Sequence, residues 1–183
     1  MLVGFAFGYI TLLFFTAIEM AGKLVDFQVG FSMGEVYDPN LGVSMSNYGR
    51  VYYWLSICIF FMTNLHHQLL RSLVYSYELV PISQSSFQYF GTEGMLSLFG
   101  KVFGLAFQLA IPLMMVALLS EVVLALLSRT VPQINVLVLG MPVKILMSLI
   151  FFLLFISLLI QNIGNVLPEM IRYTNQFMES LTL

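Results

Sequence analysis

Three ionisable side chains near the N-terminus have the spacing of one helix face. Glu19, Lys23 and Asp26 stand at i, i+4 and i+7, so on a helix they would form a stripe of opposite charges. One interpretation is that the members of the stripe neutralise one another. The other is that the stripe faces an aqueous path, because ionisable groups at membrane depth usually face cavities or protein. The remaining acids are scattered singly, so the sequence does not predict an enzyme.

A second polar cluster contains Asn64, His66, His67 and Gln68. Adjacent histidines on a helix point about 100° apart, so one metal ion rarely binds both. Hydrogen bonding between helices is therefore favoured over a metal or proton-relay role. The sequence contains no H-x-x-x-H, no H-E-x-x-H and no G-x-x-x-x-G-K-[ST] motif, which are the usual zinc and nucleotide patterns. We expect no catalytic residue, no metal and no cofactor.

The composition that surrounds these residues is strongly apolar. Of 183 residues, 60% are hydrophobic and 9% are charged, whereas a soluble domain has about 45–50% and about 25%. This composition excludes a soluble enzyme and a disordered chain. Seven Lys and Arg against nine Asp and Glu argue against nucleic-acid binding. The single cysteine, Cys58, excludes an intrachain disulfide and a Cys-rich metal site.

The charges divide the sequence into intervals long enough for helices that span a membrane, which need about 20 residues. The uncharged intervals are 1–18, 51–70, 102–120 and 145–168. We therefore predict an all-α integral membrane protein, a single helical domain over residues 1–183 with about four long hydrophobic helices or helix hairpins. Pro112 should kink the third of them, and Gly4 and Gly8 have a spacing that lets a neighbouring helix approach closely. The first interval lacks the basic start and cleavage site of a signal peptide.

Residues 29–45 interrupt the helical pattern. The segment is apolar but rich in glycine, and it contains the turn signal Asp38-Pro39-Asn40. Irregular apolar backbone is tolerated in a membrane protein where it is buried in protein or lines a cavity. The alternative is a surface loop that rests on the lipid headgroups.

Residues 129–144 form a second interruption that is too short to cross a bilayer as a helix. Pro132 and Pro142 frame the segment, and Arg129 and Lys144 flank it. We expect a connection between two long helices that packs against protein. Its polar side chains, Gln133 and Asn135, would supply hydrogen bonds to backbone groups that the prolines leave unpaired. Glu121, which precedes the segment, would share a helix face with Arg129.

Taken together, these motifs resemble the FliR/SpaR/YscT family of the flagellar and virulence type III export apparatus. The motifs, in order, are Ala21-Gly22, Gln28-x-Gly30-Phe31, Asp38-Pro39, Asn64-x-His66, Ser76 with Pro81, Ala110-x-Pro112, Arg129-x-x-Pro132-Gln133-x-Asn135 and Gly140-x-Pro142-x-Lys144. The last two are the most specific, and the resemblance covers essentially the whole chain. Two features depart from the family: Leu65 stands where the family usually has glycine, and family members have further hydrophobic helices at the N-terminus.

The resemblance implies a non-enzymatic export-gate subunit in the bacterial inner membrane, at a flagellar basal body or an injectisome base. Its partners would be FliP-like and FliQ-like subunits, an FlhB-like protein, membrane lipid and transiting unfolded polypeptides. A pore-closing plug would fall on residues 29–45, with candidate residues Gly30, Phe31, Met33, Tyr37, Asp38, Pro39 and Met45. Candidate packing and assembly residues are Asn64, His66, Arg129, Pro132, Gln133, Asn135, Pro142 and Lys144. The alternatives are a structural membrane subunit or a small-molecule permease, although the sequence lacks the internal repeat common in permeases.

Overall fold

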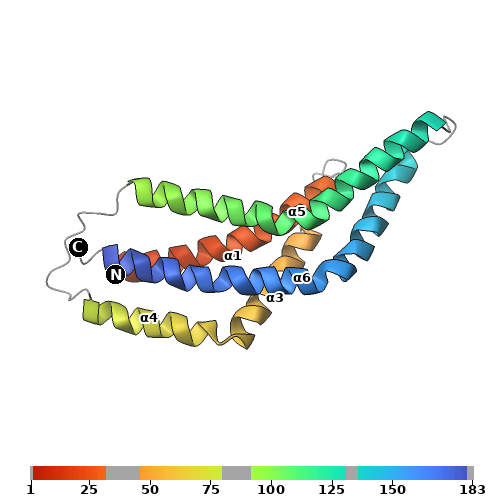
Figure 1. Ribbon diagram of the computed structural model, residues 1–183. Coiled ribbons are helices and arrows are strands. Elements are labelled where there is room, and N and C mark those ends of the chain that lie inside the picture. Colours follow the sequence, from red (N-terminus) through yellow and green to blue (C-terminus); the bar gives the residue numbers. More distant parts are fainter. Residues whose placement is uncertain (1, 32–45, 80–91, 131–135, 181–183) are drawn as a thin grey trace, which may run out of the picture.

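The computed structural model describes residues 2–31, 46–79, 92–130 and 136–180. Within these ranges the chain consists of helices and short turns, with no β-strand (Figure 1). The helices are α1 (Leu2–Val29), α3 (Asn47–Met62), α4 (Leu65–Leu79), α5 (Thr92–Thr130) and α6 (Val136–Ser180). The prediction of an all-α protein is confirmed.

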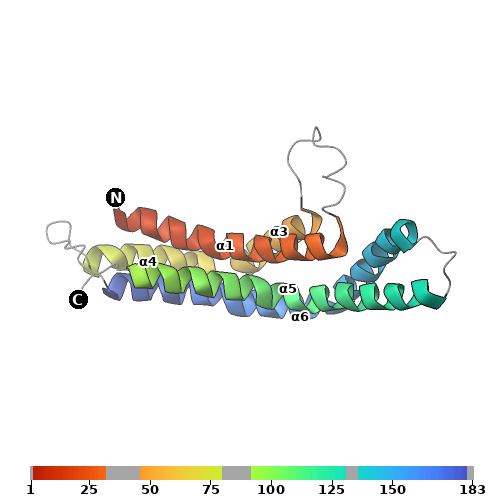
Figure 2. The same cartoon turned by 90° about the horizontal axis from the view of Figure 1, so that it is seen from above.

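Helices α1, α5 and α6 run lengthwise beside one another, and the first turns of α3 pack against the C-terminal half of α1 (Figures 1 and 2). Helix α4 lies against α6 on the side away from α5. The end of α5 and the start of α6 extend beyond the other helices. We call residues 121–130 of α5 and 136–150 of α6 the outer hairpin; its base contacts α1 and α3 through Glu121 and Ser148.

The packing of α1 follows from one apolar stripe. Its buried side chains recur at intervals of three and four residues, which places them on one helix face. The members of the stripe are Ile10, Phe14, Ala17, Ile18, Ala21, Val25 and Val29. The opposite face carries Phe5 and Phe27, which are 73% and 75% exposed. Helix α1 therefore has apolar side chains on its exposed face as well, beside the Glu19–Lys23 pair, but its buried stripe is the face that packs against α3, α5 and α6.

Three helices in the described part of the chain are long and apolar enough to cross a membrane. They cover Gly4–Val29, Leu96–Thr130 and Gly140–Gln176. The second predicted helix, 51–70, is broken between α3 and α4 at Thr63 and Asn64. Asn64 has φ +57°, a left-handed conformation that ends a helix and that asparagine adopts more readily than most residues. The break leaves two helices of 16 and 15 residues, each shorter than a typical span.

Helix α5 contains Pro112 in its interior and changes direction near its middle (Figure 1). This change of direction confirms the predicted kink. Its cause is that a proline cannot donate a hydrogen bond to the carbonyl four residues earlier. The expected connection at 129–144 is mostly helical, because α5 continues to Thr130 and α6 begins at Val136. Pro142 lies inside α6, so it does not frame a turn.

Candidate functional site at the base of residues 32–45

Helix α1 ends in a defined glycine cap. Gly30 has φ +99°, a conformation that favours glycine because it lacks a Cβ atom. The backbone N–H groups of Gly30 and Phe31 both donate to the carbonyl oxygen of Asp26, at 3.0 Å each. This pattern is that of a helix C-terminus closed by a left-handed residue, and it fixes the point at which the chain leaves α1.

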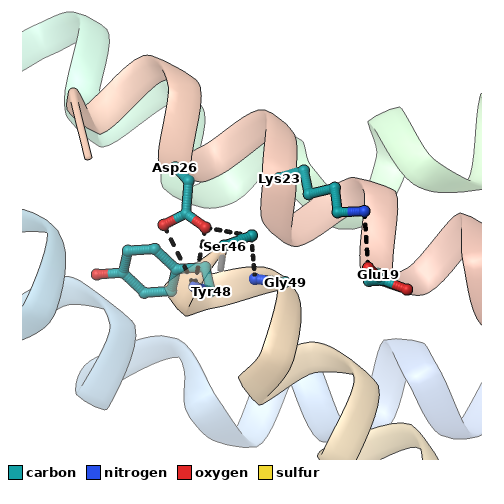
Figure 3. Close-up of polar contacts among 6 residues, drawn as sticks. All are labelled: Glu19, Lys23, Asp26, Ser46, Tyr48 and Gly49. Atoms are coloured by element: carbon teal, nitrogen blue, oxygen red, sulfur yellow. Dashed lines mark hydrogen bonds and ion pairs between the residues drawn. The ribbon is translucent and has the colours of Figure 1, made fainter. Parts of the chain in front are cut away.

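Helix α3 begins with a serine cap that contacts the same aspartate. Ser46 Oγ accepts a hydrogen bond from the Gly49 N–H at 2.9 Å, and its hydroxyl donates to Asp26 Oδ2 (Figure 3). The Tyr48 N–H also donates to the Asp26 carboxylate, at 3.0 and 3.2 Å to its two oxygens. Asp26 therefore holds both ends of the chain that flank residues 32–45, by its carbonyl on one side and its carboxylate on the other. We call Asp26, Gly30, Phe31, Ser46, Tyr48 and Gly49 the stem site.

The Asp26 side chain is buried, with 3% of the residue exposed. A buried carboxylate needs compensating donors, and here they are the Ser46 hydroxyl and the free N–H groups at the start of α3. The partial positive charge of a helix N-terminus favours a carboxylate at that position. Within the predicted charged stripe, Glu19 and Lys23 form an exposed ion pair at 2.7 Å. Mutual neutralisation is thus confirmed for Glu19 and Lys23, whereas Asp26 points into the protein.

The stem site also requires that α1 and α3 cross at close range. A Cβ atom on Gly22 would lie 2.5 Å from both Gly49 Cα and the Tyr48 carbonyl carbon, which is less than any real Cβ contact. The two backbones therefore touch at Gly22. No helix in the described part of this chain approaches closely at Gly4 or Gly8, because a Cβ atom at either position would meet no atom within 4 Å.

Tyr48 connects the stem site to α6. Its hydroxyl lies 2.9 Å from Ser148 Oγ, and its ring contacts those of Phe31 and Phe152, with centroids 6.0 and 5.4 Å apart. Burial raises the pKa of the Tyr48 phenol, so the hydroxyl stays protonated and can donate. The partly buried Phe31, a candidate plug residue, therefore packs on the first turn of α3.

A second polar contact joins three helices beside the stem site. Lys144 Nζ of α6 lies 2.6 Å from Glu121 Oε1 of α5, and Gln28 Nε2 of α1 donates to Glu121 Oε2 at 3.3 Å. From the sequence, Glu121 is expected only to share a helix face with Arg129; its ion-pair partner in the structure is Lys144. Arg129 lies in the exposed last turn of α5.

The second polar cluster lies at the turn between α3 and α4. Asn64 is exposed, and the His66 ring packs against Phe61, with centroids 5.1 Å apart. His66 Nδ1 is buried and has no hydrogen-bond partner in the described part of the chain, so the predicted interhelical hydrogen bonding is not found for this atom. The resemblance leads one to expect glycine at position 65, but Leu65 is 3% exposed and packs in the apolar core. This turn needs no glycine at position 65, because its left-handed residue is Asn64.

The remaining candidate residues fall into two groups. Pro142 is exposed on the first turns of α6. The others lie outside the described residues, and they are Met33, Tyr37, Asp38, Pro39, Met45, Pro132, Gln133 and Asn135.

Sequence reasoning missed the partners that complete the stem site. Ser46, Tyr48 and Ser148 are common residue types, and Ser148 is 100 residues from Tyr48 along the chain. One local signal was available for Ser46, since serine directly before a helix is a preferred N-cap. Among the described residues there is no group of three metal-ligating side chains. The arrangement of the stem site holds two chain ends together.

Comparison with known proteins gives a consistent relationship. The family model described as "Bacterial export proteins, family 1" matches residues 1–170. The chain is 34% identical over 169 residues to Flagellar biosynthetic protein FliR of Bacillus subtilis (strain 168), which covers 90% of this chain and 65% of the relative. It is 33% identical over 150 residues to Yop proteins translocation protein T of Yersinia pestis, covering 78% of this chain and 56% of the relative.

Surface presentation of antigens protein SpaR of Shigella sonnei is 29% identical over 178 residues, which covers 96% of this chain and 68% of the relative. The chain thus spans 56% to 68% of the length of these three relatives. Because the family model covers residues 1–170 and the matched relatives are FliR, SpaR and the Yop translocation protein T, the chain belongs to bacterial export protein family 1, the FliR/SpaR/YscT family.

Proposed function

We propose that this protein is a non-enzymatic subunit of a type III protein export apparatus, in the bacterial inner membrane at the base of a flagellum or an injectisome. The observation that carries the proposal is the family match over residues 1–170. Relatives named for flagellar biosynthesis and for Yop translocation support it. Three long apolar helices are consistent with a membrane position. The subunit would form part of the conduit for unfolded polypeptides.

The proposed partners are FliP-like and FliQ-like subunits and an FlhB-like protein. The outer hairpin is a suitable surface for such contacts, since large apolar side chains on both of its helices are exposed. Leu126 of α5 is 59% exposed and Leu146 of α6 is 60% exposed. Arg129 lies on the same projecting part and would contribute a charged contact at its edge.

We further propose that residues 29–45 form the plug of the conduit. Methionine is flexible and polarisable, so Met33 and Met45 could adapt to varied side chains, and glycines let a backbone change conformation at low strain. The stem site supports this assignment, because Asp26 bonds to the chain on both sides of residues 32–45. The described residues that flank the segment, Phe31 and Ser46, are thereby held at one place on the protein.

Co-production with the FliP-like and FliQ-like subunits of the same bacterium tests the subunit assignment. We expect a complex that survives detergent extraction and size-exclusion chromatography. Arg129→Ala should reduce the yield of this complex. Arg172→Ala, which removes an exposed arginine from the distant end of α6, is the matched control and should not. Failure to form any complex would contradict the subunit assignment, and equal yields for both variants would contradict the role of Arg129.

The plug assignment needs a separate measurement. Residues 32–45 are replaced by a four-residue Gly-Ser linker, which retains the stem site. Cells with the assembled complex should then show a larger ion or small-molecule leak than cells with the unchanged chain. A matched variant, Lys23→Met, alters an exposed residue beside the stem site and should leave the leak unchanged. An unchanged leak after the replacement, in an intact complex, would reject the plug and leave the subunit assignment standing.

A further inference from the structure

Two polar contacts link α6 to the neighbourhood of Asp26, one through the start of α3 and one through the last turn of α1, and they lie one helical turn apart on α6. Lys144 and Ser148 are spaced i and i+4, so they share a face of the helix. Ser148 bonds to Tyr48 of α3, and Lys144 reaches Gln28 of α1 through Glu121 of α5. The first contact ends on Tyr48, whose N–H donates to Asp26, and the second ends on Gln28, two residues after Asp26.

The direction of the hydrogen bonds can be assigned for the first contact. Ser148 Oγ lies 2.8 Å from the Ile145 carbonyl oxygen, which can only accept. A serine hydroxyl has one hydrogen, so the Tyr48 hydroxyl must donate to Ser148 Oγ. Tyr48 thereby donates at both ends, from its backbone N–H to Asp26 and from its hydroxyl to α6. Ser148 is 1% exposed, so water does not compete for this bond.

The second contact uses a charge that is largely removed from solvent. The Lys144 side chain is 15% exposed, whereas Glu121 is 53% exposed. Glu121 accepts from Lys144 with one carboxylate oxygen and from Gln28 with the other. Gln28 lies in the last turn of α1, midway between Asp26 and Gly30. A shift of the outer hairpin therefore displaces the acceptor of Gln28 directly.

We propose that Lys144, Glu121, Gln28, Tyr48 and Ser148 are positioning residues that couple the outer hairpin to the stem site. The two contacts act in parallel, one on the end of α1 and the other on the start of α3. Displacement of the hairpin would loosen the bonds from Asp26 to Phe31 and Ser46. Coupling of this kind requires that the network of these five residues has two arrangements, and that the outer hairpin and the stem site each favour one of them. The coupling concerns this chain alone and does not depend on what the protein exports.

Amide hydrogen exchange of the full chain in lipid nanodiscs tests the proposal. The test variant is Lys144→Met, which is not itself bonded to the stem site. The matched control is Lys101→Met, because Lys101 and Glu169 form another α5–α6 ion pair at 3.3 Å, about 30 Å from Glu121 along α5. Loss of a partly exposed ion pair corresponds to a change of about fivefold in a local equilibrium. We expect about fivefold faster exchange at Phe31, Tyr48 and Gly49 in Lys144→Met only.

Two further variants test the proposal. The exchanged pair Glu121→Lys with Lys144→Glu should restore slow exchange at the stem amides, which a loss of packing alone would not do. Tyr48→Phe, which removes only the hydroxyl, should accelerate the same amides. Unchanged stem exchange in Lys144→Met would overturn the proposal, and so would equal acceleration in Lys101→Met, because that result indicates general destabilisation. If Lys144→Met does not fold, the exchange rates of the same three amides in the exchanged pair and in Tyr48→Phe test the proposal.

Discussion

Gly22 of α1 and Gly49 of α3 bring the two helix backbones into direct contact. The Cβ position of Gly22 is occupied by Gly49 and the Tyr48 carbonyl carbon, and Gly49 in turn donates to the Ser46 cap. This crossing places the first turn of α3 within reach of the Asp26 carboxylate. Without it, the donors at the start of α3 would lie too far from α1 to compensate a buried charge.

Gly22→Ala should therefore destabilise the protein. The new methyl group overlaps backbone, which cannot move aside as a side chain can, so we expect a loss of about 2 kcal/mol or more in the free energy of unfolding. Denaturation of the purified chain in detergent, followed by circular dichroism, measures the loss. Gly8→Ala adds the same methyl group in open space and should leave stability unchanged or slightly higher. Equal midpoints for the two variants would contradict the crossing.

Asp26→Asn tests the charge at the stem site with little change in shape. The variant keeps one oxygen acceptor but loses the negative charge at the start of α3, which should lower the free energy of unfolding by about 1–3 kcal/mol. Glu19→Gln breaks the exposed ion pair on the same helix and should lower it by less than about 0.5 kcal/mol. If the two variants lose the same free energy in chemical denaturation, Asp26 does not have the role assigned to it.

Ser46→Ala removes the cap of α3 and one donor to Asp26. Loss of a serine N-cap lowers stability by about 0.5–2 kcal/mol. Because Ser46 and Asp26 are bonded to each other, the double variant Ser46→Ala with Asp26→Asn should lose less than the sum of the single variants. Full additivity in a double-mutant cycle would show that the two residues act independently.

Asn64→Val should weaken the junction between α3 and α4. Asn64 has φ +57°, and a β-branched residue is strained in this conformation by about 1–2 kcal/mol. Asn64→Gly adopts the same backbone without strain, so its stability should be close to that of the unchanged chain. Thermal unfolding distinguishes the two variants. A Val variant as stable as the Gly variant would mean that the junction is not left-handed.

Tyr52→Phe and Tyr52→Ala separate packing from hydrogen bonding in the core. The Tyr52 side chain is fully buried, and its hydroxyl donates to the Leu109 carbonyl oxygen at the long distance of 3.4 Å. Removing the hydroxyl should cost less than about 1.5 kcal/mol, whereas removing the ring should cost about 3–5 kcal/mol through the cavity left behind. Similar losses for both variants would assign the main contribution to the hydrogen bond.

The long helices could be predicted from the sequence because their signals are local. Uncharged intervals located α1, α5 and α6, and glycine-rich composition marked the end of α1 near Gly30. The break at Asn64 was not predicted, because 51–70 carries no charged residue and a single residue in a left-handed conformation divides it. Hydrophobicity alone does not report the backbone conformation of a single residue.

The contacts of the stem site could not be predicted because they join distant parts of the chain. Asp26 and Lys23 have the spacing of an ion-paired stripe. Asp26 instead accepts hydrogen bonds from the start of α3, and it can do so only because α1 and α3 cross closely at Gly22. Likewise, Glu121 has Arg129 nearby in sequence, but the packing of α5 on α6 brings Lys144 to it. Helical periodicity gives the face on which a side chain lies, whereas its partner depends on how the helices pack.

Because Asp26 fixes both Phe31 and Ser46, the spacing of α1 and α3 does not depend on the length of the segment between them. The entropy of closing a loop grows slowly, by about 0.6 kcal/mol for each doubling of its length. A peptide tag inserted between residues 32 and 45 is thus expected to leave the packing of α1 on α3 intact, so its effect on the proposed plug can be measured separately from the stem site.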